Sequence, residues 1–294
     1  MIKLTTPLNI DLKMVNTFVG RAADFIELDN AWPKHCIFGV FGLRSVGKSR
    51  FVSELLKRQG QHNSSVYSDL RTLTNLESVF ANMSATLNLG HGSTHFEDMP
   101  DTKLDERSIF RGLNHTINTE RDELQRQYRC IVFDNAEDLV ESQDGGTFLQ
   151  FCTKIIRQVR NVKIIITSTT CAGFAEVGRV FCLHELKPLV TSDACALLKQ
   201  VAPGIDFGDT LREIAEFSEG LPLLIQMIGA ELLADNGLLE PREMLELLST
   251  TRLKTLSGEH YPPEDRIGLL SEIFRCIVTD CSSVRAVVVG YSST

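Results

Sequence analysis

The chain has 294 residues, of which 43% are hydrophobic, so it is long enough to bury a sizeable core. Its net charge of −8 and pI of about 5.4 give no overall basic field that would attract nucleic acid. Its 8 cysteines include no C-x-x-C pair and no Cys/His spacing typical of zinc, and no apolar run is long enough to cross a bilayer. These features favour a reduced, cytoplasmic protein with no nucleic-acid or membrane partner.

Short apolar runs alternate with segments of helical periodicity as far as about residue 186. The predicted strands are residues 34–42, 65–71, 128–134, 162–170 and 180–186. A helix is predicted to begin near Lys48, and others over residues 73–90, 106–127 and 148–159. The helix over 106–127 is predicted to be charged and largely exposed, and residues 91–105 are predicted to form a polar loop. Strands that alternate with helices predict a mostly parallel sheet with helices on both faces.

After Lys187 the strand-like runs stop and short helices follow. Four are predicted, over residues 191–203, 209–220, 222–237 and 241–253, two of which begin at Pro and two of which end at Gly. The last segment contains one further amphipathic stretch, from Ile267 to Val278, and a strand-like run at 285–290. We therefore expect an all-helical unit attached to an α/β unit.

A phosphate-binding motif joins the first predicted strand to the next helix. Residues 42–49, GLRSVGKS, match G-x-x-x-x-G-K-S in the strand–helix setting that the motif requires. Its backbone N–H groups would point at phosphate oxygens, at the positive end of the helix. Lys48 would offer its ammonium to the β- and γ-phosphates, and the Ser49 hydroxyl would bind Mg²⁺. The expected nucleotide contacts are Gly42, Leu43, Arg44, Ser45, Val46, Gly47, Lys48, Ser49 and Arg50.

Asp134 ends the apolar run CIVFD and is the candidate second metal ligand, holding Mg²⁺ through its water shell. An aspartate there would also suit the N-cap of the following helix. Hydrolysing P-loop proteins often carry an acid at the next position, where this chain has Asn135. Glu137 and Asp138 lie a little further on and could reach the water, or could simply start a helix, where acids are also favoured. Of the two, Glu137 is the candidate general base. The predicted catalytic residues are Lys48, Asp134 and Glu137.

The segment TKLD at 102–105 is similar to the guanine-reading [NT]-K-x-D element. It lies in a polar loop before the acidic strand, whereas that element follows an apolar strand. We therefore expect ATP or ADP, with Mg²⁺, rather than a guanine nucleotide.

Five segments in order resemble the NB-ARC group of STAND ATPases, the nucleotide switches of apoptotic and innate-immune receptors. They are FVGR (18–21), GLRSVGKS (42–49), IVFDNAED (131–138), KIIITSTT (163–170) and EGLPLLIQMIG (219–229). The resemblance spans roughly residues 17–250. It implies adenine contacts from Val19, Gly20 and Arg21, a phosphate contact from Ser168 or Thr169 in the sensor strand, and a lid contact from Pro222 in the GLPL motif.

The resemblance also predicts a domain order. Residues 1–16 would be an N-terminal segment, 17–186 the α/β nucleotide-binding domain, and 187–255 a helical lid similar to the ARC1 unit. Residues 256–294 would be a linker and the truncated start of a winged-helix domain. The expected fold class is thus α/β, a P-loop NTPase of the ASCE or AAA+-like type, with a parallel sheet between helices and a small all-α lid.

The sequence departs from the family in ways that bear on hydrolysis. The sensor strand has the sequence Thr167-Ser168-Thr169. It lacks the arginine that often contacts the γ-phosphate at this place in the family. The M-H-D motif, repeat array and effector domain of the family are not recognisable. We therefore expect a regulatory switch that binds ATP or ADP and hydrolyses it slowly or not at all, with oligomerisation through the nucleotide-binding domain and protein partners that the sequence does not identify.

Two alternatives remain open at this stage. An active AAA+-like ATPase would need an arginine finger from a neighbour, for which Arg157, Arg160 and Arg179 are candidates by position. An interaction scaffold on a decayed P-loop fold would need no nucleotide, and the intact Gly47, Lys48, Ser49 and Asp134 argue against it.

Overall fold

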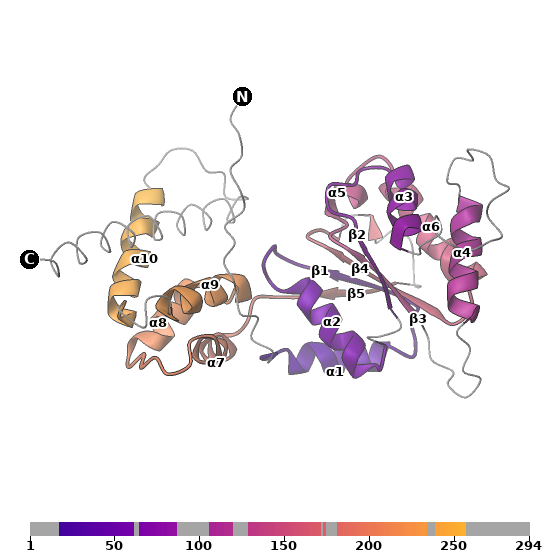
Figure 1. Ribbon diagram of the computed structural model, residues 1–294. Helices are drawn as coiled ribbons and strands as arrows, with labels where there is room; N and C mark the ends of the chain where they lie inside the picture. The colour runs from indigo at the N-terminus through magenta and orange to yellow at the C-terminus, as the bar shows by residue number, and fades with distance from the viewer. Residues whose placement is uncertain are drawn as a thin grey trace, which may run out of the picture. The chain divides into compact units, whose positions relative to one another are not determined.

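The computed structural model describes residues 18–61, 65–86, 106–119, 129–171, 173–174, 181–233 and 239–256 (Figure 1). It divides into two compact units. The α/β unit contains Arg21–Leu43 and Gly47–Lys187, and the helical unit contains Met1–Gly20, Arg44–Val46 and Pro188–Thr294. The predictions for residues 1–16, 91–105, 120–127 and 257–294 lie outside the described residues. No helix in the described part of the chain is long and apolar enough to cross a membrane.

A five-stranded parallel sheet forms the centre of the α/β unit, with strand order β2-β3-β4-β1-β5. The strands are β1 (Ile37–Phe41), β2 (Ser65–Asp69), β3 (Arg129–Asp134), β4 (Val162–Ser168) and β5 (Phe181–Glu185). Its helices are α1 (Ala22–Ala31), α2 (Lys48–Arg58), α3 (Leu76–Thr86), α4 (Glu106–Thr119), α5 (Glu137–Val140) and α6 (Gly145–Gln158). Helices cover both faces of the sheet (Figure 1), which confirms the predicted α/β fold with a parallel sheet.

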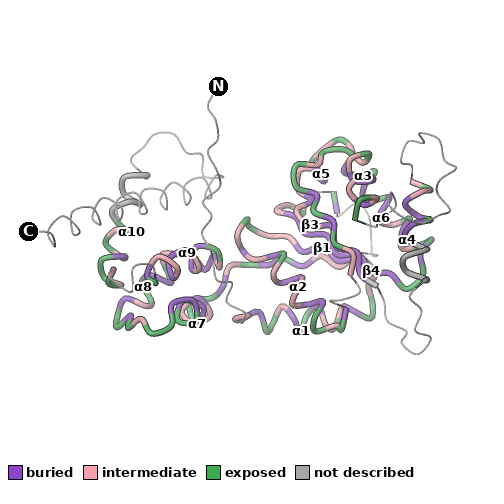
Figure 2. The backbone as a smooth tube through the Cα atoms, viewed as in Figure 1, coloured by how far each residue is buried: buried purple, intermediate pink, exposed green. Residues whose placement is uncertain are grey.

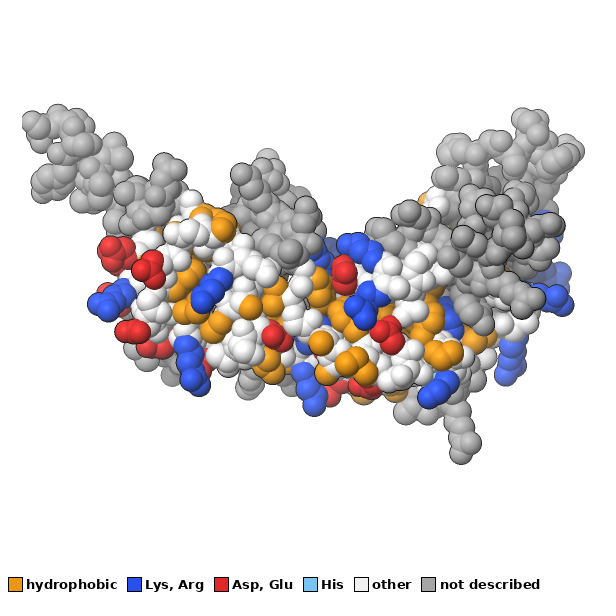
Figure 3. Space-filling model, turned by 90° about the horizontal axis from the view of Figure 1, so that it is seen from below, with side chains coloured by type: hydrophobic (Ala, Val, Ile, Leu, Met, Phe, Trp, Pro, Cys, Tyr) orange, Lys and Arg blue, Asp and Glu red, His pale blue; other side chains and the backbone are white. Residues whose placement is uncertain are grey.

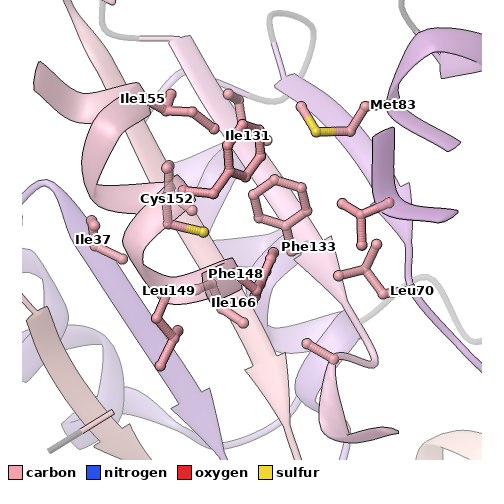
Figure 4. Close-up of a cluster of buried hydrophobic side chains, with 14 of the residues drawn as sticks. Ile37, Leu70, Met83, Ile131, Phe133, Phe148, Leu149, Cys152, Ile155 and Ile166 are labelled. Carbon is pink, nitrogen blue, oxygen red and sulfur yellow. The ribbon is translucent and has the colours of Figure 1, made fainter. Parts of the chain in front are cut away.

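Alternate strand residues supply the core on the face covered by α3, α4 and α6. Phe133 of β3 packs edge-on against Phe148 of α6, with ring centroids 5.2 Å apart, among the side chains drawn in Figure 4. Ile131, Ile164 and Ile166 belong to the same buried cluster. Because neighbouring residues of a strand point to opposite faces, the continuous apolar runs of β3 and β4 supply both layers.

On the other face, α1 and α2 pack through aromatic side chains. Phe25 of α1 stacks on Phe51 of α2 with ring centroids 4.8 Å apart, and Trp32 stacks on Phe38 of β1 at 5.0 Å. The ammonium of Lys163 in β4 donates to the carbonyl oxygens of Trp32 (2.7 Å) and His35 (2.6 Å), just beyond the end of α1. Burial lowers the pKa of Lys163 from its ordinary value. The central strands are mainly buried (Figure 2).

Two features of this unit differ from the sequence-based prediction. The expectation that the helix from residue 106 is largely exposed is wrong for its first two turns, because Ile109, Phe110 and Leu113 are buried in the core cluster. Helix α1 was not predicted. It buries only Phe25 and Leu28, and its N-cap residue makes no side-chain cap, so its sequence carries a weak helical signal.

The helical unit contains the four helices expected from the sequence. They are α7 (Thr191–Val201), α8 (Thr210–Phe217), α9 (Pro222–Leu233) and α10 (Pro241–Leu256). Helices α7 and α9 approach closely at Gly229, where an added Cβ would lie 2.5 Å from the Val201 side chain. Gly220 precedes α9 with φ +69°, and an added Cβ would meet the Leu189 carbonyl oxygen at 2.1 Å, so this turn requires glycine.

Candidate functional site

The predicted phosphate loop connects β1 to α2 and contains three residues with positive φ. Gly42 has φ 148°, Ser45 has φ 62° and Gly47 has φ 94°, and Gly47 is the N-cap of α2. An added Cβ on Gly42 would lie 2.4 Å from the Leu186 carbonyl oxygen. The loop therefore curls tightly into the N-terminus of an 11-residue helix, where the N–H groups of the first turn and the helix dipole favour an anion.

Lys48 lies within this loop. Its Nζ donates to the carbonyl oxygens of Gly42 (2.9 Å) and Leu43 (3.1 Å), and the residue is 8% exposed. The ammonium is thus held where the backbone curls, next to the first turn of α2. An ammonium held there is able to donate a charge-assisted hydrogen bond to a phosphate oxygen.

Ser49 and Asp134 come together although they are far apart in the sequence. Ser49 Oγ donates to Asp134 Oδ1 at 3.0 Å, and the Thr167 hydroxyl of β4 donates to the same oxygen. A hydroxyl and a carboxylate are hard oxygen ligands of the kind that Mg²⁺ prefers. The described residues contain no group of three or more His, Cys, Asp or Glu that could hold a metal. One hydroxyl and one carboxylate suit an ion that keeps most of its water and binds phosphate, as Mg²⁺ does.

Thr167 is a site residue that the sequence analysis missed. Its Oγ1 accepts the backbone N–H of Asn135 at 2.9 Å, and its carbonyl accepts the N–H of Ala136 at 2.8 Å. These bonds fix the turn after β3. Ser168, the predicted sensor residue, is 1% exposed, and its Oγ accepts the Thr170 N–H at 3.2 Å. The proposed phosphate contact of Ser168 stays a prediction.

Asp69 was also missed. It ends β2, and the strand register pairs it with Asp134. Asn135, which has φ 57°, donates from Nδ2 to Asp69 Oδ1 at 2.9 Å. Tyr67 lies two residues earlier in β2, and burial together with the charge of Asp134 raises its pKa to about 12. The carboxyl ends of β2 and β3 thus carry a concentrated negative charge.

The acids that follow Asn135 start a short helix. Glu137 is the first residue of α5, and its Oε2 is buried without a hydrogen-bond partner in the described part of the chain. Asp138 Oδ2 accepts the Thr72 N–H at 3.1 Å, which ties α5 to the segment after β2. The catalytic role predicted for Glu137 stays a prediction.

The remaining predicted contacts lie at the start of α1 and in the helical unit. Gly20 (φ 74°) and Arg21 (φ 68°) form the turn after Val19, and the buried Arg21 guanidinium donates to the Lys187 carbonyl. Arg21 therefore ties the start of α1 to the segment that follows β5. Pro222 opens α9. The nucleotide contacts of Val19, Gly20, Arg21 and Pro222 stay predictions.

The two arginine-finger candidates among the described residues lie away from this site. Arg157 lies in the last turn of α6 and Arg160 precedes β4. Both are exposed and lie near the amino end of β4, whereas the phosphate loop follows the carboxyl end of β1. Arg179 lies outside the described residues.

Charge is mixed on one face of the described residues. On the face drawn in Figure 3, Lys and Arg side chains of the described residues are interspersed with Asp and Glu side chains rather than gathered in one basic patch. The expectation of no nucleic-acid partner stays a prediction.

No protein-family model matches this sequence, and no curated protein matches it. Solved structures do match. A Walker-type ATPase of Pyrococcus abyssi superposes with a TM-score of 0.57 at 17% identity, covering 87% of this chain and 89% of that chain. Cdc6p of Pyrobaculum aerophilum gives 0.55 at 14% identity, with coverages of 90% and 83%.

A third structure is a Signal Transduction ATPase with Numerous Domains (STAND) with a tetratricopeptide repeat sensor, from Pyrococcus horikoshii. It superposes with a TM-score of 0.50 at 16% identity, and the match covers 88% of this chain but 39% of that one. These three similarities show that the chain has the α/β fold of P-loop ATPases.

Proposed function

We propose that the chain is an ATP/ADP-binding regulatory switch module of a STAND/NB-ARC signalling protein, with slow or absent hydrolysis. The observation that carries this proposal is the convergence of Lys48, Ser49 and Asp134 at the carboxyl edge of the sheet. The Lys48 ammonium lies 2.9 Å from a loop carbonyl, and the Ser49 hydroxyl lies 3.0 Å from the Asp134 carboxylate. A cation, a hydroxyl and a carboxylate at one helix N-terminus suit a nucleotide phosphate with Mg²⁺.

Each residue has a separate role in this proposal. The N–H groups of the loop surround the phosphates, Lys48 neutralises the β- and γ-oxygens, and Ser49 and Asp134 hold Mg²⁺ directly or through water. The bound Mg²⁺ supplies charge neutralisation at the phosphates. Thr167 keeps the Asp134 carboxylate oriented, because its hydroxyl bonds that carboxylate and also accepts the Asn135 N–H.

Two features favour a switch over a rapid enzyme. The position after Asp134 is an asparagine whose side chain is already bonded to Asp69 at 2.9 Å. Residues 167–169 contain no arginine that could read the γ-phosphate. The similarity to a protein named as a signal transduction ATPase supports the same class, and this chain corresponds to 39% of that protein. Cytoplasmic location and oligomerisation through the α/β unit belong to this proposal.

The second candidate is an active AAA+-like ATPase. It is favoured by the similarity to a Walker-type ATPase and to Cdc6p, whose chains are covered to 89% and 83%. This candidate predicts turnover well above about one per minute, toward the roughly 1–10³ per second typical of enzymes, and loss of that turnover in Glu137→Gln.

The content and the retention of nucleotide distinguish the two candidate functions. Purified protein would be denatured and its released nucleotides separated by liquid chromatography, and native mass spectrometry would give the stoichiometry. A switch module should carry close to one ADP or ATP per chain and should retain added ATP over many minutes. Protein free of nucleotide that also fails to bind added MgATP would contradict the proposal.

A further inference from the structure

The site described above has an acid and an amide on neighbouring strand ends. Asp69 ends β2 and lies in register with Asp134, which ends β3. Asn135 follows Asp134 and donates from Nδ2 to Asp69 Oδ1 at 2.9 Å. Position 135, where hydrolysing P-loop proteins often carry an acid, thus holds an amide. The nearest carboxylate on the adjacent strand is that of Asp69, which accepts a hydrogen bond from this amide.

We propose that Asp69 is the general base of a slow ATP hydrolysis and that Asn135 positions it. This inference rests on the proposed nucleotide site and narrows "slow or absent" hydrolysis to slow. Asp69 takes a proton from the attacking water while the water oxygen bonds to the γ-phosphorus of ATP. The bond from that phosphorus to the bridging oxygen breaks, ADP and phosphate leave, and the proton passes from Asp69 to solvent.

The other nearby acids are less suited to this step. Glu137 is half-buried and its Oε2 is buried, so its carboxylate meets solvent less than that of the exposed Asp69. Asp138 accepts the Thr72 N–H at 3.1 Å, and Asp134 accepts the hydroxyls of Ser49 and Thr167. The Asp69 side chain is 56% exposed, which leaves it open to a water.

Arg71 pairs with the Asp69 carboxylate before the proton transfer. Its backbone N–H donates to Asp69 Oδ1 at 3.1 Å, and its Nη2 lies 3.6 Å from Oδ2. Both carboxylate oxygens are therefore engaged, and the base has to leave the guanidinium before it accepts a proton. The Arg71 side chain is 70% exposed, and an ion pair so exposed is weak, so the release costs little.

Three variants test the inference by exchanging acid and amide. Asp69→Asn removes the base but keeps an amide that can bond Asn135. The exchange variant Asp69→Asn/Asn135→Asp returns one carboxylate to the pair on the other strand, and aspartate tolerates the positive φ at 135 about as well as asparagine does. Glu137→Gln tests the rival base.

Asp29→Asn is the matched control. Asp29 also accepts an amide hydrogen bond, from Gln59 at 2.5 Å, and also pairs with an arginine, Arg58, at 3.2 Å. It bonds the far end of α2, about 15 Å along the helix from Lys48. Asp29→Asn therefore removes one carboxylate that is bonded to an amide and paired with an arginine, as Asp69→Asn does, but away from the site.

Two readouts are needed, the single-turnover rate with radiolabelled MgATP and the Kd for a fluorescent ATP analogue. We expect Asp69→Asn to lower the rate by about 10²-fold or more. Its Kd should stay within about threefold, because the phosphate contacts are intact. The exchange variant should recover the rate to within about tenfold of wild type, and Asp29→Asn should leave both values unchanged.

Three results would overturn the inference. One is an unchanged rate in Asp69→Asn, and another is loss of hydrolysis in Glu137→Gln with retention in Asp69→Asn. The third is a wild-type protein that binds ATP but never turns it over, which would leave the proposed switch intact. A wild-type protein that binds no nucleotide would instead refute the proposed function itself.

Discussion

Replacing Gly42 by alanine should destabilise the α/β unit. The added Cβ would lie 2.4 Å from the Leu186 carbonyl oxygen, well inside contact distance. The obstacle is backbone, and it is held in place, because the Leu186 N–H donates to the Phe41 carbonyl at 2.8 Å as a continuation of the β1–β5 pairing. To relieve this clash, the end of β5 would therefore have to move away from β1.

The size of the effect follows from two contributions. Overpacking against a fixed neighbour costs about 1–3 kcal/mol, and a non-glycine residue at a φ of 148° adds about 1 kcal/mol. We expect a loss of roughly 2–4 kcal/mol in the free energy of unfolding, or a Tm lower by roughly 5–15 °C for a unit of this size.

Trp32 is a suitable probe for this measurement. It is the single tryptophan of the sequence, is 9% exposed, and stacks on Phe38 of β1. Urea unfolding would be followed by its fluorescence in wild type and Gly42→Ala. The control is Gly146→Ala in α6, where an added Cβ meets nothing within 4 Å, so stability should be unchanged or up to about 1 kcal/mol higher. Equal stability of Gly42→Ala and wild type would refute the close-approach reasoning.

Two further predictions concern the interior of the α/β unit. Thr167→Val should lower the free energy of unfolding by about 1–3 kcal/mol and weaken MgATP binding, because the Asn135 N–H loses its acceptor and Asp134 loses a donor; urea unfolding and nucleotide titration measure the two effects. Burial raises the pKa of the Cys130 thiol from 9.0 to about 12. The unfolded chain therefore releases this proton above about pH 9 while the folded chain keeps it, so stability should fall between pH 9 and 12 by up to about 1.4 kcal/mol per pH unit. Urea unfolding at pH 8, 9 and 10 should show a shallower fall in Cys130→Ala.

The controls for these two variants differ in kind. Thr153→Val removes a hydroxyl that bonds a carbonyl of its own helix, Leu149, at 3.0 Å, and should cost much less than Thr167→Val. Comparable losses in the two threonine variants would contradict the role given to Thr167. For the thiol, an identical pH slope in wild type and Cys130→Ala would show that Cys130 does not titrate on unfolding.

The sequence predicts a strand, helix or turn correctly where the signal lies in the residues of that segment itself. Runs such as CIFGVF and CIVFD are apolar without interruption, as a strand covered on both faces requires, and GLRSVGKS specifies its turn chemistry locally. Helix α1 escaped prediction because Phe25 and Leu28 are its only buried residues. The burial of α4 escaped because its apolar residues are spaced among charged ones, and only the neighbouring α3 and α6 show which side is covered.

The pairing of site residues was harder to predict than the motifs. Asp69 and Thr167 join the site because β2 and β4 flank β3, and strand order is a property of the tertiary fold. Nothing in the local sequence SVYSD shows that its last residue lies in register with Asp134. A sequence motif thus located the phosphate loop, whereas the residues around it required the sheet order.

The most direct test of the central claim is the MgATP affinity of wild type and Lys48→Ala, measured by calorimetry. Charge-assisted hydrogen bonds contribute about 1.5–3 kcal/mol each, so the loss of the ammonium should weaken binding by at least about tenfold. Lys57→Ala, which removes an exposed lysine of the same helix paired with Glu54 at 3.3 Å, should bind as wild type does. Equal affinity of Lys48→Ala and wild type would contradict nucleotide binding at this loop.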